Sequence, residues 1–318
     1  MRTEKEMYDL ILGIAQADDR IRGVYMGGSR TNPNAVRDLF QDYDIVYIVT
    51  ETESFIKDTS WIDRFGERLF MQYPDENPAY PHKKDESYGW LIQFSDGNRL
   101  DLHVMIPDRA LKDISDDRLC KILLDKDNIL PVIPESSDQS HWVKRPSETE
   151  FLCTCNEFWW CLDNVAKGLW RNEIPYVQDM INHYIRPQLV ALLSWKIGIV
   201  TGFSCSIGKA GKDMYRWLSE GEWESFLKTY ADAETEHIWE AVEIMCNLFH
   251  EVAGFVSGEL GFFYDITEAS NCMGYLNHVR ELPPDAKQVY CRNRITNITC
   301  DKGKSMDFSK HAAEIHGF

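Results

Sequence analysis

Residues 21–46 read IRGVYMGGSRTNPNAVRDLFQDYDIV and contain the two motifs that decide the fold. The apolar run 21–26 leads into Gly27-Gly28-Ser29-Arg30, which predicts a strand followed by a glycine turn. Glycine lets the backbone come close to a ligand, and successive N–H groups in such a turn can hold a phosphate. Most Gly-Gly turns are only turns, so this motif gains weight only from its neighbours.

The second motif, Gln41-Asp42-Tyr43-Asp44-Ile45-Val46, places two acids at the start of a predicted strand over 43–50. Because strand side chains alternate between faces, Asp42 and Asp44 share one face, with their Cα atoms roughly 6.5–7 Å apart. Both carboxylates can therefore bind one hard cation, and Mg²⁺ is commonly held by one or two carboxylates together with substrate phosphates. An isolated pair of this kind is more often a solvated strand end.

A third acid, Asp101, lies in the run Arg99-Leu100-Asp101-Leu102-His103-Val104, where polar and apolar residues alternate as in a half-buried strand. By the same alternation, His103 shares the face of Asp101. We expect this strand to lie in the same sheet as Asp42 and Asp44, paired through an Asp96-Gly97 turn with a strand over 89–94. A lone acid in a strand often only faces solvent, but three acids on one sheet face favour a metal site.

The first 135 residues predict a mixed β-sheet packed against helices. Apolar residues recur at helical spacing over 4–17, and residues 51–72 also look helical, while the strand patterns lie around and between these segments. A stretch with Pro131, Pro134 and two serines then indicates a linker. We therefore expect an α+β protein whose first domain, residues 1–135, holds the glycine turn and the three acids.

The rest of the chain predicts a mostly α-helical second domain over residues 148–290. Ser147 and Glu150 form a capping-box pattern at its start, and the apolar period is helical from there on. We expect one of its helices to begin at Asp213, directly after a turn rich in Gly and Lys. Residues 291–318 are polar and weakly patterned, which predicts a flexible tail.

Charge and composition exclude several classes of partner. The chain has 318 residues with 34 basic and 51 acidic side chains, a formal net charge of −17. A polyanion would be repelled, so we expect no nucleic-acid partner and no anionic membrane surface, whereas a cationic small substrate would be attracted. The start of the chain lacks a signal-peptide pattern and the nine cysteines lack framework spacing, which favours reduced thiols and a cytoplasmic location.

Together, the glycine turn, the Asp-x-Asp motif and the third strand acid resemble the nucleotidyltransferase fold of the DNA polymerase β superfamily. With the segments Gly208-Lys209-Ala210-Gly211-Lys212 and Tyr275-Leu276-Asn277-His278-Val279-Arg280, the chain resembles the aminoglycoside 6-adenylyltransferases over about residues 1–290. The resemblance implies an antibiotic-resistance enzyme with Mg²⁺ as cofactor and ATP as co-substrate. It would transfer AMP to an aminoglycoside hydroxyl, most directly the 6-hydroxyl of streptomycin, and release pyrophosphate.

The resemblance also implies roles for individual residues. Asp42 and Asp44 would hold the metal, and Asp101 would be either a third ligand or the general base for the acceptor hydroxyl. Gly28, Ser29 and Arg30 would hold the phosphates. Nucleotidyl transfer needs a divalent metal that neutralises the triphosphate and aligns the attack, so the three acids suit this reaction.

The Gly208–Lys212 segment suits a triphosphate as well, although it lacks the spacing of a P-loop. Lysine ammonium groups near the start of the helix expected at Asp213 would attract phosphates, and we expect Lys209, Lys212 and Tyr215 to contact the nucleotide. The alternative is a solvated loop that happens to carry lysines.

A cationic acceptor requires carboxylates and aromatic faces. Trp170, Glu173 and Asp179 offer both in a loop that enters a helix, and Glu157 and Asp163 on the preceding helix are further candidates. Each acid could instead be a helix cap or a solvated residue. The remaining hypotheses are an enzyme of the same fold acting on a protein, a lincosamide or an RNA, and a non-catalytic ligand-binding relative. We expect a monomer or a weak dimer.

Overall fold

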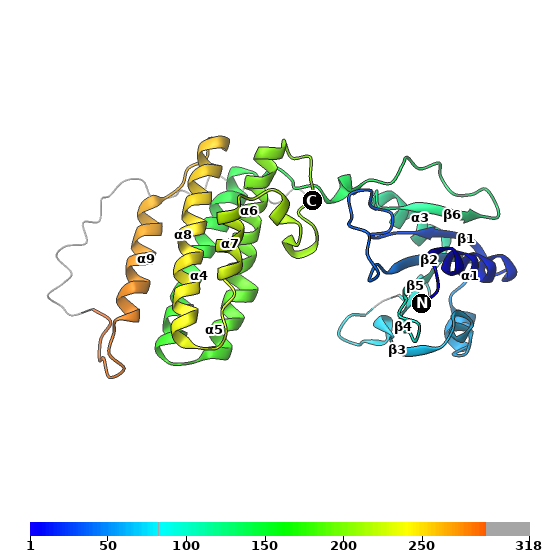
Figure 1. Cartoon of the computed structure of the whole chain (residues 1–318), viewed down its shortest axis with the longest axis horizontal. Helices are drawn as coiled ribbons and strands as arrows, with labels where there is room; N and C mark the ends of the chain where they lie inside the picture. Colours follow the sequence, from blue (N-terminus) through cyan, green and yellow to red (C-terminus); the bar gives the residue numbers. More distant parts are fainter. Residues whose placement is uncertain (82, 291–318) are drawn as a thin grey trace. The chain divides into compact units, whose positions relative to one another are not determined.

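The computed structural model describes residues 1–81 and 83–290, and the tail expected at 291–318 lies outside the described residues. The chain divides into two compact units, with the boundary between His141 and Trp142 (Figure 1). The first unit contains the β-sheet and the second consists of helices, so the predicted α+β fold class is confirmed.

The first unit is built on one mixed sheet with the strand order β3-β4-β5-β2-β1-β6. β2 and β5 run parallel at its centre, and the other neighbouring pairs are antiparallel. The strands are β1 (Ile21–Met26), β2 (Tyr43–Val49), β3 (Arg68–Gln72), β4 (Ser87–Phe94), β5 (Arg99–Met105) and β6 (Lys121–Asp125). The helices are α1 (Glu4–Ala17), α2 (Glu53–Lys57) and α3 (Pro107–Asp116), with 3-10 turns at Trp61–Phe65, Pro74–Glu76 and Asp138–His141.

Alternation along β2 assigns its side chains to two different layers. Tyr43, Ile45 and Tyr47 belong to the core that α1 covers, and the Tyr47 hydroxyl donates to the carbonyl of Ile11 on that helix at 2.6 Å. Val46 and Ile48 belong to a smaller core on the opposite face, which includes residues of α3. Asp44 precedes Val46 on this second face, so the sheet carries its acids on the side away from α1.

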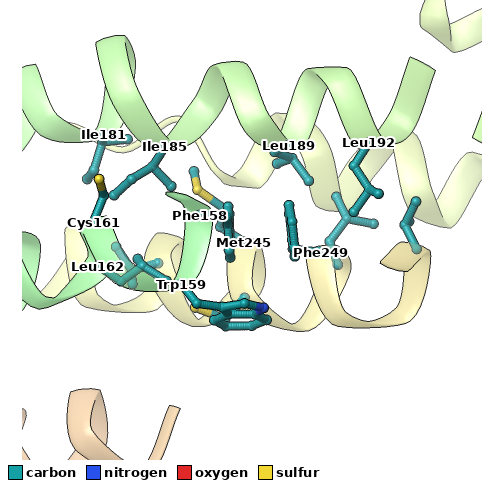
Figure 2. Packing of buried hydrophobic residues seen from close by; sticks show 14 of the residues in the cluster. Phe158, Trp159, Cys161, Leu162, Ile181, Ile185, Leu189, Leu192, Met245 and Phe249 are labelled. Carbon is teal, nitrogen blue, oxygen red and sulfur yellow. The ribbon is translucent and has the colours of Figure 1, made fainter. Parts of the chain in front are cut away.

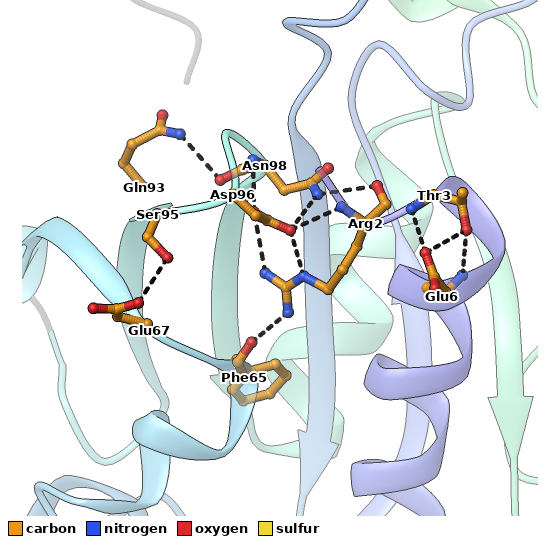
Figure 3. Close-up of polar contacts among 9 residues, drawn as sticks. All are labelled: Arg2, Thr3, Glu6, Phe65, Glu67, Gln93, Ser95, Asp96 and Asn98. Carbon is orange, nitrogen blue, oxygen red and sulfur yellow. Dashed lines mark hydrogen bonds and ion pairs between the residues drawn. The ribbon is translucent and has the colours of Figure 1, made fainter.

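The start of α1 is fixed to the sheet by polar contacts (Figure 3). Thr3 and Glu6 form a capping box, and Arg2 donates from its backbone N and its Nε to Asp96 in the β4–β5 turn at 2.9 and 2.7 Å. Partial burial raises the pKa of Asp96, but hydrogen bonds from Arg2 and Asn98 outweigh it and hold this pKa well below its ordinary value. The hairpin predicted around Asp96-Gly97 is therefore confirmed and tied to the N-terminus.

The helix expected over 51–72 is wrong. The structure has the short helix α2, a 3-10 turn at Trp61–Phe65 and then the edge strand β3. Gly66 ends the 3-10 turn with φ of +120°, a conformation that other residues rarely adopt. The apolar residues Phe55, Trp61 and Phe65 are buried under the sheet as an aromatic cluster rather than along one helix face.

The second unit is a helical bundle whose core lies between its long helices (Figure 2). Phe158 and Phe249 stack with ring centroids 3.6 Å apart, and Trp159 packs edge-on against both. Its helices are α4 (Glu148–Trp170), α5 (Ile174–Met180), α6 (Arg186–Thr201), α7 (Glu220–Lys228), α8 (Thr235–Leu260) and α9 (Ile266–Arg280). The Ser147–Glu150 capping box at the start of α4 is confirmed. None of the helices in the described part of the chain has the length and apolarity to cross a membrane.

Candidate active site

The three predicted acids lie together on the sheet. Asp44 and Asp101 are direct partners in the parallel β2–β5 pair, so their side chains stand side by side, with the strands roughly 4.8 Å apart. Asp42 directly precedes β2, and a single guanidinium contacts both Asp42 and Asp101. The register of two strands that are distant in sequence therefore assembles one acidic group.

The glycine turn lies directly against this group. The backbone N–H of Gly27 donates to the carbonyl of Asp44 at 2.9 Å, and Gly28 has φ of +66°. A Cβ at residue 28 would lie 2.6 Å from Cγ of Asp44 and would overlap its Oδ2 atom, so only glycine fits here. The Thr31 hydroxyl closes the turn by donating to the Gly28 carbonyl at 2.8 Å.

Burial and the neighbouring negative charges raise the pKa of two of the acids. Burial, followed by the charges of Asp101 and Asp42, raises the pKa of Asp44 to about 6. Burial also raises the pKa of Asp42, although Arg99 opposes the shift. The carboxylates are thus held closer together than their mutual repulsion favours, and a bound cation would relieve this repulsion.

Arg99 is the functional residue that the sequence analysis missed. Its Nε and Nη2 atoms donate to the two carboxylate oxygens of Asp101 at 2.9 and 2.7 Å, and its Nη1 atom lies 3.4 Å from Oδ2 of Asp42. The spacing of two residues on one strand was a usable signal, because it places Arg99 and Asp101 on the same face. His103 follows on that face, with its ring packed over Gly89 of β4.

Arg30 and Ser29, the two residues of the turn predicted to contact phosphates through their side chains, differ in their surroundings. Arg30 is largely buried, stacks 3.7 Å from the Tyr43 ring centroid, and donates to the carbonyls of Asp42 and Gln41 at 2.9 Å each. These hydrogen bonds hold the 31–41 segment against the start of β2. Because they use two nitrogens of the guanidinium, Arg30 has no free pair of donors for a bidentate contact with a ligand. Ser29 lies beside the acids, where Gln41 donates weakly to its hydroxyl at 3.4 Å.

The acids fit a hard divalent cation by their chemistry. Asp42, Asp44 and Asp101 supply oxygen donors only, which is the set that Mg²⁺ prefers, with phosphate oxygens expected to complete it. Among the residues that the structure describes, no three acidic, His or Cys side chains already converge as a metal cluster. The guanidinium of Arg99 contacts two of the three acids.

In the helical unit, the helix expected at Asp213 is wrong. Residues 209–211 and 214–216 form 3-10 turns, and the next helix, α7, begins only at Glu220. Gly208 and Gly211 have φ of +72° and +78°, which breaks any helical run through the segment. Lys209, Lys212 and Tyr215 are exposed in this loop, but no helix N-terminus adds to them.

The structure separates these three residues from the predicted acceptor residues. The 202–219 loop lies at the start of α4, because the backbone N of Val143 donates to the carbonyl of Cys205 at 2.9 Å. Trp170 ends the 23 residues of α4, roughly 33 Å farther along at the helical rise, and Glu173 and Asp179 follow it. One small ligand in this unit cannot contact both sets.

The acceptor candidates differ in their surroundings. Glu173 and Asp179 are exposed and pair with Arg171 at 3.8 Å and His183 at 2.9 Å. Glu157 accepts a weak bond from Cys161. Asp163 instead lines a pocket of about 460 Å³ formed by residues of α4 and α9. The pocket also contains Trp159, Trp160, Asp265, Thr267, Glu268, Asn271, Cys272 and Tyr275.

Comparisons with known proteins agree on one family. The family model for streptomycin adenylyltransferase matches residues 1–279. An aminoglycoside 6-adenylyltransferase of Bacillus subtilis (strain 168) is 41% identical over 266 residues, which cover 83% of this chain and 93% of that protein. One from Campylobacter jejuni is 39% identical, covering 84% and 92%. A crystal structure of a 6-adenyltransferase from Bacillus subtilis, 34% identical, covers 89% of this chain and all of that chain with a TM-score of 0.44.

Proposed function

Because the chain belongs to the streptomycin adenylyltransferase family, we propose that it transfers AMP from ATP to the 6-hydroxyl of streptomycin. Membership makes the chain an aminoglycoside O-nucleotidyltransferase. The choice of streptomycin, of ATP as donor and of Mg²⁺ as metal is our proposal. The observation that supports it most directly is the group of three carboxylates beside the Gly28 turn.

The three acids would have different roles at the reacting phosphate. Asp42 and Asp44 would hold Mg²⁺, which when bound neutralises the triphosphate and polarises the reacting phosphate. Asp101 would be either a third ligand or the general base that takes the proton of the attacking hydroxyl. A base must come within about 2.6–3.2 Å of that hydroxyl, and the parallel register already brings Asp101 beside Asp44.

Backbone groups of the glycine turn would bind the leaving phosphates. Gly28 brings its backbone against Asp44, so N–H groups of the 28–29 turn can face phosphates held there, and the Ser29 hydroxyl can add a further bond. Contacts of Lys209, Lys212 and Tyr215 with the nucleotide stay a prediction from the sequence, and all three side chains are exposed in the helical unit. Arg30 would hold the turn in place instead of contacting the ligand.

Charge and aromatic groups support a polycationic acceptor. The formal net charge of −17 attracts a drug with guanidinium groups. The exposed set Trp170, Glu173 and Asp179 and the pocket containing Asp163 and Glu268 both combine acids with aromatic rings, which suits such groups. The two sets are alternatives, and substitutions in each distinguish them.

The test is pyrophosphate release with MgATP and a panel of aminoglycosides, for wild type, Asp42→Asn and Asp116→Asn. Asp116 is an exposed acid at the end of α3 and serves as the matched control. We expect release with streptomycin, its loss in Asp42→Asn and its retention in Asp116→Asn. No release with any drug would contradict the proposal and direct attention to protein, lincosamide or RNA acceptors. Release that survives Asp42→Asn would show that the metal site is elsewhere.

A further inference from the structure

The candidate acid group already contains a positive charge, the guanidinium of Arg99. We propose that Arg99 is a resident counter-ion for Asp42 and Asp101. It excludes divalent cations from the nucleotide-free protein and moves to the phosphates when nucleotide and metal enter together. The inference rests on the proposed function, because it takes these acids as the metal ligands.

Arg99 contacts three of the carboxylate oxygens in the acid group. Two of its nitrogens donate to the two oxygens of Asp101 at 2.9 and 2.7 Å, a bidentate pair, and its third nitrogen lies 3.4 Å from Oδ2 of Asp42. A guanidinium is permanently charged and offers no lone pair, so it repels a cation at the same place. Metal binding to Asp42 and Asp101 therefore requires the guanidinium to leave.

The position of Arg99 allows it to leave. It is the first residue of β5, and its side chain is 43% exposed, so the guanidinium can rotate away without disturbing the sheet. A triphosphate bound at the Gly28 turn would offer a new partner beside the acids, because Gly28 lies against Asp44. The fork of arginine matches phosphate oxygens as well as it matches carboxylates. Exchange of partners would thus couple metal entry to nucleotide entry.

Binding of Mn²⁺ to the nucleotide-free full-length protein tests the inference, with free Mn²⁺ measured by electron paramagnetic resonance. We expect Arg99→Gln to bind Mn²⁺ about tenfold more tightly than wild type, since a nearby positive charge is lost in a partly exposed site. Arg22→Gln is the matched control, because Arg22 also forms a bidentate pair with an acid, Asp127, and lies in β1 beside the Val49 end of β2, opposite the end that carries Asp44. We expect it to bind Mn²⁺ as wild type does.

The sign of the change separates this role from a purely structural one. A salt bridge that only orders Asp101 would leave Mn²⁺ affinity unchanged or lowered in Arg99→Gln, and that result would overturn the inference. Arg99→Lys keeps the charge but cannot bridge two carboxylates, so its Mn²⁺ affinity should lie between those of wild type and Arg99→Gln. If Arg99→Gln does not fold, equal Mn²⁺ affinities of Arg99→Lys and wild type refute the inference.

A double variant separates failure of the inference from failure of the proposed function. Adding Asp44→Asn to Arg99→Gln should abolish the Mn²⁺ affinity that Arg99→Gln gained. Affinity that persists in the double variant would place the metal away from these acids, which contradicts the proposed site itself. Equal affinity of wild type and Arg99→Gln, with loss of binding in Asp44→Asn, would contradict only the counter-ion role.

Discussion

The substitution Gly28→Ala should displace the carboxylate of Asp44 within the acid group. Two costs arise separately: an L-residue at φ of +66° costs about 1–2 kcal/mol, and the new Cβ would lie 2.6 Å from Cγ of Asp44, so this carboxylate must move. A displacement of about 1 Å at a reacting centre can cost about 100-fold in rate. We therefore expect kcat/KM for adenylylation to fall by about 100-fold or more.

Gly202→Ala isolates the backbone cost, because Gly202 has φ of +64° and nothing lies within 4 Å of its added Cβ. Both variants should lose about 1–2 kcal/mol of unfolding free energy in urea from the left-handed backbone, with a further loss from the displaced carboxylate in Gly28→Ala only. Gly202→Ala should keep kcat/KM within about threefold of wild type. Equal kcat/KM in the two variants would refute the close contact between the turn and Asp44.

Three further predictions concern the acids. Asp44→Asn should stabilise the metal-free protein by about 2–3 kcal/mol at pH 7 and by little at pH 4. The folded-state pKa of about 6 is raised, so wild type loses stability as pH rises from about 4 to about 6; urea unfolding at both pH values checks this, and equal effects would contradict it. Asp101→Asn should weaken Mn²⁺ binding in the presence of a non-reacting ATP analogue if Asp101 is a ligand, but should lower only kcat if it is the base. Glu268→Gln should raise the KM for streptomycin about tenfold if the α4–α9 pocket binds the drug, whereas Glu173→Gln should do so if the exposed set binds it.

Local patterns predicted the parts of the site that depend on one strand at a time. Side-chain alternation predicted that Asp42 and Asp44 share one face and that Asp101 lies in a strand, because a side-chain period of two residues is a property of any strand. The parallel register that sets Asp44 against Asp101 depends on how residues 50–98 pass over the sheet, which no local pattern encodes. The same limit hid the contact of Arg99 with Asp42, which precedes the neighbouring strand, whereas its pairing with Asp101 two residues away on one strand was open to prediction.

Two errors came from interpreting apolar or basic runs as helices. Residues 51–72 carry enough apolar side chains for a helix, but tertiary packing buries them as an aromatic cluster and then adds an edge strand. Residues 208–216 contain two glycines whose positive φ values end any helical turn, and their conformation follows from the loop's attachment to the start of α4. Tertiary context outweighed local propensity in both places.

The parallel pairing of β2 and β5 has a consequence for how the chain acquires activity. Asp44 and Asp101 are 57 positions apart, and the intervening chain forms two other strands, β3 and β4. Contacts of such long sequence separation form slowly, because the loop-closure entropy is lost before they are made. The acids therefore meet only once β5 has paired with β2. Protection from proteolysis by the nucleotide is therefore expected only for chains in which β5 has paired with β2.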